Sequence, residues 1–227
     1  MRHLCRSAVG RYHGEGKGRR ILDIGCGTGE MTKSLDALGR TYGADIADEA
    51  ISFCRKRGLE RLVRTSAQMA GFKDGAFSTV VAFCLIEHMD DDAAFLKEMN
   101  RIMESKGHIV ILTSAFKFLW SEHDELAHHK RRYRLGQLKR LMRENGFVIK
   151  RSSYVNSFLF PAIAVIRMIQ KCFHIHTSSE KKFVLDFVKL PGLLNDLFYG
   201  LLVAESNIIK YIDLPVGVGI LCIGQKV

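Results

Sequence analysis

Short apolar runs alternate with amphipathic stretches through the first two thirds of the chain, and this alternation is the feature that most limits its fold. The runs expected to form strands are residues 20–24, 41–46, 62–65, 79–83, 108–113 and 147–151. Helical spacing is found in residues 30–38, 48–57 and 134–144, and in a stretch that begins near Asp91 and ends near Ile102. Regular βα alternation favours parallel strands joined by right-handed crossovers. We therefore predict an α/β fold with an open, doubly wound sheet.

The pattern changes after about residue 154. Residues 157–173 and 193–212 have helical spacing and are unusually apolar, and strand character returns at residues 216–225. We interpret residues 154–212 as a helical cap that is inserted before the last strand. The length of 227 residues suits one domain, 1–227, with this insertion inside it.

The charge balance is basic. The chain has 34 Lys and Arg against 24 Asp and Glu, a formal net charge of +10, with basic clusters in residues 1–20 and 130–143. Such a balance indicates an anionic partner, which can be a phosphate, a membrane surface or a nucleic acid. No aromatic interleaving or RNA-binding module accompanies the basic residues, so a nucleic-acid partner is disfavoured. The simplest alternative for residues 130–143 is a solvated helix face, and no helix or strand is assigned to residues 1–19.

Cysteine usage and apolar runs bear on location. The six cysteines include no CxxC pair, which argues against structural zinc. The N-terminal residues contain no apolar run of the signal-peptide kind, and the longest apolar run, residues 158–166, is too short to cross a bilayer. These features predict a cytoplasmic protein with reduced thiols.

The segment ILDIGCGTG is the strongest chemical signal. A predicted strand delivers Asp23 to a turn in which Gly25, Gly27 and Gly29 allow tight turning and close approach of a ligand. A dinucleotide site uses GxGxxG, whereas here Glu30 follows three residues after Gly27 and would repel a pyrophosphate. The two carboxylates suit the ammonium of S-adenosylmethionine (SAM), which has no phosphate.

With these residues the chain resembles the class I SAM-dependent methyltransferases. The segment WSEHDELAHHKRRY is similar to one in the type 11/12/23-like methyltransferase group of mostly bacterial members, with Trp-Ser-x-His-Asp followed by Arg-Arg-Tyr. The resemblance implies a Rossmann-like, seven-stranded sheet with the last strand antiparallel, SAM as cofactor and S-adenosylhomocysteine as product. It also implies a set of cofactor-binding residues, in which Asp45 holds the ribose: Asp23, Gly25, Cys26, Gly27, Gly29, Asp45, Ile46, Ser66, Ala67 and Cys84.

Ser66 departs from the pattern of this family. Many relatives place Asp there to accept a hydrogen bond from the adenine amine. Ser66 can accept one without charge, which costs on the order of 1 kcal/mol. We expect SAM to bind, with reduced affinity.

Glu87 and His88 follow the fourth predicted strand, where the substrate cleft of the family opens. His88 could deprotonate an attacking hydroxyl. Some quinol O-methyltransferases resemble this stretch and bind a divalent ion with an acidic residue three positions before the Glu–His pair. Here that position is Cys84, a poor ligand for a hard ion, so no metal is expected. The alternative is that Glu87 and His88 only shape the cleft and cap the next helix.

The Trp-Ser-x-His-Asp segment follows the fifth predicted strand and is expected to roof the site. His123 or His129 could act as a base that is oriented by Asp124, whereas His128 replaces a usual Gly. The alternative is a polar loop held by its own hydrogen bonds. The residues expected to contact the acceptor are Glu87, Trp120, Asp124, Arg131, Arg132 and Tyr133.

These motifs predict methyl transfer from SAM to a small-molecule or lipid-like acceptor. Two alternatives stay open, an RNA methyltransferase and a non-catalytic SAM-binding partner protein. The apolar insertion, with the basic balance, is compatible with peripheral membrane contact or with a homodimer.

Overall fold

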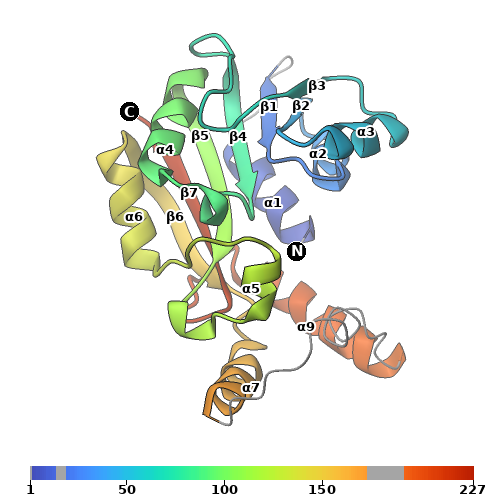
Figure 1. Ribbon diagram of the computed structural model, residues 1–227, viewed down its shortest axis with the longest axis vertical. Helices are drawn as coiled ribbons and strands as arrows, with labels where there is room; N and C mark the ends of the chain where they lie inside the picture. Colours follow the sequence, from blue (N-terminus) through green and yellow to red (C-terminus); the bar gives the residue numbers. More distant parts are fainter. Residues whose placement is uncertain (1, 14–18, 173–191) are drawn as a thin grey trace.

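The computed structural model describes residues 2–13, 19–172 and 192–227, and its centre is a seven-stranded sheet. The strand order is β3-β2-β1-β4-β5-β7-β6 (Figure 1). Strands β1 to β5 pair in parallel, whereas β7 runs antiparallel to both β5 and β6. The strands are β1 (Arg20–Ile24), β2 (Arg40–Asp45), β3 (Leu62–Arg64), β4 (Phe77–Phe83), β5 (Met103–Ser114), β6 (Phe147–Val155) and β7 (Gly219–Lys226). The predicted α/β fold, with its antiparallel last strand, is confirmed.

Helices cover both faces of this sheet. They are α1 (Arg2–His13), α2 (Glu30–Leu35), α3 (Asp48–Lys56), α4 (Asp92–Ile102), α5 (Glu122–Leu126), α6 (Leu135–Glu144), α7 (Phe160–Cys172) and α9 (Gly192–Ile208), with short 3₁₀ turns η1 (Ile86–His88) and η2 (Lys117–Leu119). The helix boundaries follow local signals. Asp91 caps α4 by accepting a hydrogen bond from the backbone N–H of Ala94 at 2.8 Å.

The chain reverses its direction of growth across the sheet between β1 and β4. Strands β1 to β3 are added toward one edge, and β4 and β5 are added toward the other. In open α/β sheets, ligands bind at such a switch point, outside the carboxyl ends of the strands. The loop after β1 and the segment after β4 meet there, which places the glycine-rich turn beside the residues that follow Phe83.

Two apolar clusters form the core on opposite sides of the sheet. One contains Phe95, Met99 and Leu138 from α4 and α6, packed on β4, β5 and β7. The other contains Leu4 and Val9 of α1 with strand residues of β1, β5 and β7.

Helix α1 was not predicted, and its presence corrects the assignment of residues 1–19. Its apolar side chains recur at helical spacing, but Gly10 and the surrounding basic residues obscure that pattern. The tertiary contact with the sheet stabilises it, since Cys5 and Val9 are fully buried.

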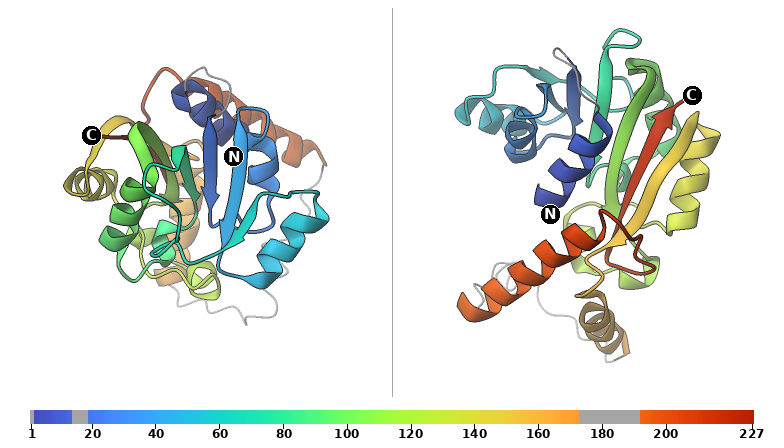
Figure 2. Two further views of the ribbon diagram at one scale, coloured as in Figure 1. Left: turned by 90° about the horizontal axis from the view of Figure 1, so that it is seen from above. Right: turned by 180° about the vertical axis from the view of Figure 1, so that it is seen from behind.

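The predicted insertion does lie before the last strand. Helices α7 and α9 lie between β6 and β7 in the chain. Figure 1 and the right-hand view of Figure 2 both show that they extend away from the sheet. Helix α7 has no buried residue, and α9 contacts α1. Residues 173–191 of the predicted cap lie outside the described residues. Among the helices that the structure describes, none combines the length and apolar character that a membrane crossing needs.

Candidate functional site

The turn after β1 is built by glycines in the left-handed region. Gly25, Gly27 and Gly29 have φ of 73°, 51° and 77°. A Cβ on Gly25 would lie 2.8 Å from a methyl carbon of Leu85, and one on Gly29 would lie 2.6 Å from Cys54 Sγ. A Cβ on Gly27 would meet nothing within 4 Å, so this residue faces open space at the mouth of the turn. Conformation therefore requires all three glycines, and packing requires two of them.

Two carboxylates flank this turn. Asp45, at the end of β2, accepts hydrogen bonds from the backbone N–H of Gly27 at 2.9 Å and of Ala47 at 3.0 Å. Asp23 is buried and accepts a hydrogen bond from Thr32 Oγ1 at 2.6 Å. Burial raises the pKa of Asp23 to about 6, although the Thr32 hydrogen bond lowers it and the nearby charge of Asp45 raises it further. A cation bound here would restore the charged form of Asp23.

An open cavity of about 430 Å³ lies directly in front of the turn. It is lined by Asp23, Gly25, Cys26, Thr28, Glu30, Met31 and Phe83. The lining thus combines two carboxylates with apolar side chains from α2 and β4. This donor set fits a ligand with a cationic end and an apolar middle, and it does not favour a phosphate.

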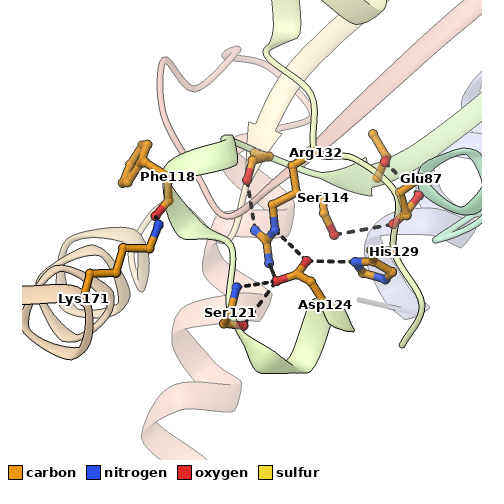
Figure 3. A network of polar contacts seen from close by, with 10 residues as sticks. Glu87, Ser114, Phe118, Ser121, Asp124, His129, Arg132 and Lys171 are labelled. Atoms are coloured by element: carbon orange, nitrogen blue, oxygen red, sulfur yellow. Dashed lines mark hydrogen bonds and ion pairs between the residues drawn. The ribbon is translucent and has the colours of Figure 1, made fainter. Parts of the chain in front are cut away.

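On the far side of the switch point, Glu87 and His88 form the turn η1 after β4. Glu87 is fully buried and accepts hydrogen bonds from Thr113 Oγ1 at 2.8 Å and Ser114 Oγ at 3.4 Å. Glu87 therefore holds η1 against β5. Both carboxylate oxygens of Glu87 face β5 (Figure 3), and its contact with the acceptor stays a prediction.

Asp124 is the centre of the network in the segment after β5 (Figure 3). Its side chain is 0 % exposed and binds Arg132 through two bonds of 2.7 and 3.0 Å. It also accepts from the Ser121 backbone N–H at 2.9 Å and lies 2.8 Å from His129 Nδ1. Burial alone would raise the pKa of Asp124, but the bonds from Arg132 and His129 and the charge of Arg132 lower it.

The three candidate histidines lie together. The ring centroids of His88 and His129 are 4.8 Å apart, and those of His123 and His129 are 6.5 Å apart, both edge to face. His129 bonds to Asp124 through Nδ1. Since the ionised Asp124 only accepts, His129 donates from Nδ1 and keeps Nε2 as an acceptor, which is the tautomer that a general base needs.

Ion pairs fasten the segment to η1 and to the start of α4. Lys130 pairs with Asp90, and its backbone N–H donates to the Glu87 carbonyl at 2.8 Å. The Arg131 guanidinium lies 2.8 Å from Asp92. Asp92 also accepts from the hydroxyl of Tyr133, which is fully buried. Asp124, Arg132 and Tyr133 thus have partners within the fold, and Trp120 is half-buried. Their contacts with the acceptor stay predictions.

Comparison with known proteins agrees with this geometry. Residues 22–111 match a family described as a methyltransferase domain. A ubiquinone biosynthesis O-methyltransferase from Xanthomonas oryzae pv. oryzae is 30% identical over 103 residues, 42% of this chain and 43% of that protein. Ajmaline N-methyltransferase from Rauvolfia serpentina is 27% identical over 202 residues, 82% of this chain and 66% of that protein. The chain thus spans less than half the length of the ubiquinone-pathway relatives that it matches.

A solved structure extends the likeness to nearly the whole chain. The Haemonchus contortus phosphoethanolamine N-methyltransferase 2 in complex with SAM superposes with a TM-score of 0.62 at 16% identity, covering 97% of this chain and 52% of that one. At this identity the likeness shows the fold alone. Residues 22–111 therefore match a methyltransferase domain, and the fold is that of the class I SAM-dependent methyltransferases.

The cavity in front of the turn is where we expect SAM to bind, and the residues present fit it. The carboxylates of Asp23 and Glu30 would hold the methionyl end, and Asp45 retains lone pairs for ribose hydroxyls. Leu85 and Thr32 also shape this site, but no motif identifies them. Leu85 packs against Gly25, and Thr32 donates a hydrogen bond to Asp23, nine positions earlier in the chain.

The residues predicted to lie on the adenine side belong to short turns. Ile46 projects into solvent after Asp45, and Ala67 is half-buried. Ser66 Oγ accepts from the backbone N–H of Gln68 at 3.3 Å, so its hydroxyl already closes a local turn. Cys84 has a φ of 51° and is exposed beyond β4. Their contacts with SAM remain predictions.

Among the described residues, no group of three or more His, Cys, Asp and Glu side chains is arranged to hold a metal ion. The Glu87–His88 pair follows Cys84, and Glu87 is directed to β5. Absence of a metal from this site remains a prediction.

Replacement of Asp45 by Ala should weaken SAM binding by about 1–3 kcal/mol, because ribose hydroxyls lose an acceptor and Gly27 loses its anchor. Isothermal titration calorimetry measures this. Asp48→Ala is the matched control, since Asp48 is exposed and pairs only with Arg64 among the interactions described. Equal affinities for the two variants would contradict the assignment of the ribose site.

Replacement of Ser66 by Asp should tighten SAM binding by up to about tenfold, because a charged acceptor then faces the adenine amine. Asp can retain the local turn with Gln68, so the loop should keep its shape. Ser66→Asn separates charge from hydrogen bonding. Unchanged or weaker binding by Ser66→Asp would mean that this loop does not face the adenine.

Replacement of His128 by Gly should stabilise the protein by about 0.5–1 kcal/mol, because His128 has a φ of 54°, which favours glycine. Urea unfolding monitored by circular dichroism measures this difference. His123→Gly, inside α5, is the opposite control and should destabilise by about 1 kcal/mol. If His128→Gly is less stable than wild type, the backbone at His128 is not strained.

Proposed function

We propose that this protein transfers a methyl group from SAM to an oxygen or nitrogen atom of a small or lipid-like acceptor. The observation that carries the proposal is the His129–Asp124 pair of 2.8 Å, with His88 against it, at the edge of the sheet where the glycine-rich turn lies. A carboxylate-oriented histidine beside a SAM-type site has the parts that proton abstraction from an acceptor requires.

The chemistry divides between the bound group and the chain. When bound, SAM would supply a methyl group on a sulfonium, with the thioether S-adenosylhomocysteine as leaving group. Nε2 of His129 would take the proton that the acceptor oxygen or nitrogen loses on methylation. Asp124 fixes the ring and stabilises the imidazolium that results. The turn after β1 and the segment after β5 align the two reactants.

The acceptor class rests on two observations. Relatives with named substrates include an O-methyltransferase of ubiquinone biosynthesis and an N-methyltransferase of ajmaline. In addition, Lys130, Arg131 and Arg132 are paired with Asp90, Asp92 and Asp124. Because these cations are neutralised within the fold, they do not form the open basic patch that RNA binding needs. A small or lipid-like acceptor is therefore favoured over RNA.

We place the protein in the cytoplasm and at a membrane periphery. All six cysteines are free thiols, as is usual in a reducing compartment. The exposed apolar residues of α7 support contact with an apolar phase or with a second copy of the chain.

A turnover screen tests the proposal. Purified protein is incubated with SAM and with phenolic, amine, phospholipid and RNA acceptors in turn, and S-adenosylhomocysteine is quantified. Turnover with a phenol, amine or lipid supports the proposal, and turnover with RNA alone favours the RNA methyltransferase. SAM binding without turnover on any acceptor favours the non-catalytic binding protein.

A further inference from the structure

Helix α7 presents a continuous apolar stripe to solvent. Ala162, Val165, Ile166 and Ile169 recur at intervals of three or four residues and are all exposed, with Met168 beside them. Between 47% and 59% of Val165, Ile166, Met168 and Ile169 is exposed. Scattered exposed apolar residues are ordinary, but four on one helix face form a patch that marks an interaction surface.

The opposite side of α7 attaches the helix to the body. Phe160 packs against Phe116 and Phe118, with ring centroids 5.8 and 6.2 Å apart. Lys171 Nζ donates to the carbonyl of Phe118 at 2.7 Å (Figure 3). This attachment to η2, which follows β5, fixes which side of the helix points outward. The apolar stripe therefore stays exposed while α7 is attached to the body of the protein.

The net charge of the chain indicates what covers the stripe. The only charged residues of α7 are Arg167 and Lys171, on the side that is attached to the body, and α7 contains no acidic residue. The whole chain carries a net charge of +10. An anionic bilayer would attract a chain of this charge and can bury an apolar helix face in its headgroup region. A second copy of the chain carries the same net charge and would be repelled.

We infer that the α7 stripe (Ala162, Val165, Ile166 and Ile169) docks the protein on an anionic lipid bilayer, with the helix lying in the plane of the interface. This inference rests on the peripheral location proposed above and names its surface and lipid class. The segment after β5 that carries Asp124 and His129 would then stand close to the membrane, since α7 is attached to η2 in the same segment. A lipid-like acceptor could reach the site without crossing water.

Vesicle flotation of the full chain tests the inference, without SAM or acceptor present. Wild type should float with vesicles of phosphatidylcholine mixed with phosphatidylglycerol and should bind phosphatidylcholine alone much more weakly. Val165→Asp should weaken binding to the mixed vesicles by about tenfold or more, because a charge would enter the apolar layer. Val148→Asp is the matched control, since Val148 on β6 is 50% exposed, close to the 55% of Val165, and should bind like wild type.

Thermal melts establish that both variants are folded, and analytical ultracentrifugation without lipid measures their mass. Equal loss of binding in both variants, or no binding by wild type, would overturn the inference. A dimeric wild type that Val165→Asp makes monomeric would assign the stripe to a second copy and would also overturn it. Because a soluble acceptor is tested without vesicles, failure of methyl transfer is seen separately from failure of docking.

Discussion

The His129→Gln variant should lose about a hundredfold or more of the methyl-transfer rate on the true acceptor. His129 is the histidine whose Nδ1 is held by the buried Asp124, and its Nε2 is left to accept a proton. Glutamine can still bond to Asp124 but cannot take the proton. Initial rates from S-adenosylhomocysteine production measure this loss.

Two other substitutions make this result specific to His129. His123→Gln removes a histidine of the same segment whose ring is farther from the dyad, and it should leave most of the rate. SAM affinity, measured by calorimetry, should be unchanged in His129→Gln, because His129 does not line the cavity in front of the turn. Full turnover by His129→Gln would make the segment a structural loop. His88, whose ring lies 4.8 Å from that of His129, would then become the candidate base.

The Asp124→Ala variant should lose about 3–5 kcal/mol of the free energy of unfolding, because Arg132 would remain buried without its counter-charge. The side chains of Asp124 and Arg132 are 0% and 8% exposed, and Asp124 also binds Ser121 and His129. Urea unfolding of both proteins measures the difference. Asp90→Ala is the matched control, since the Asp90 side chain is 82% exposed in its pair with Lys130, and it should cost at most about 1 kcal/mol.

This contribution should depend on pH with a defined sign. The pKa of Asp124 is lower in the folded protein than in the unfolded chain. Its contribution is therefore present above the ordinary pKa of an aspartate and is lost as the pH falls through the lower, folded value. The difference in the free energy of unfolding between wild type and Asp124→Ala should therefore become smaller as the pH falls. A difference that stays constant down to the acid transition, or equal costs for the two Asp→Ala variants, would show that Asp124 is not a buried ionised anchor.

The sequence by itself determined the elements whose signals are local. The glycine spacing after β1 requires a turn that only left-handed backbone can make, and Gly25, Gly27 and Gly29 do adopt it. Asp91 caps α4 through a backbone group three residues away. The periodicity of apolar residues and the capping of helices both involve neighbours along the chain. The strands and most of the helices can therefore be predicted from the sequence.

Contacts between distant residues were decided by the tertiary structure. No local pattern pairs Glu87 with Thr113 or Asp124 with Arg132. The register of β4 and β5 directs Glu87 to Thr113, and burial directs Asp124 to Arg132. Helix α1 likewise forms because the sheet offers it an apolar face. These outcomes depend on which residues of different elements share a desolvated environment, and a local pattern carries no information about that choice.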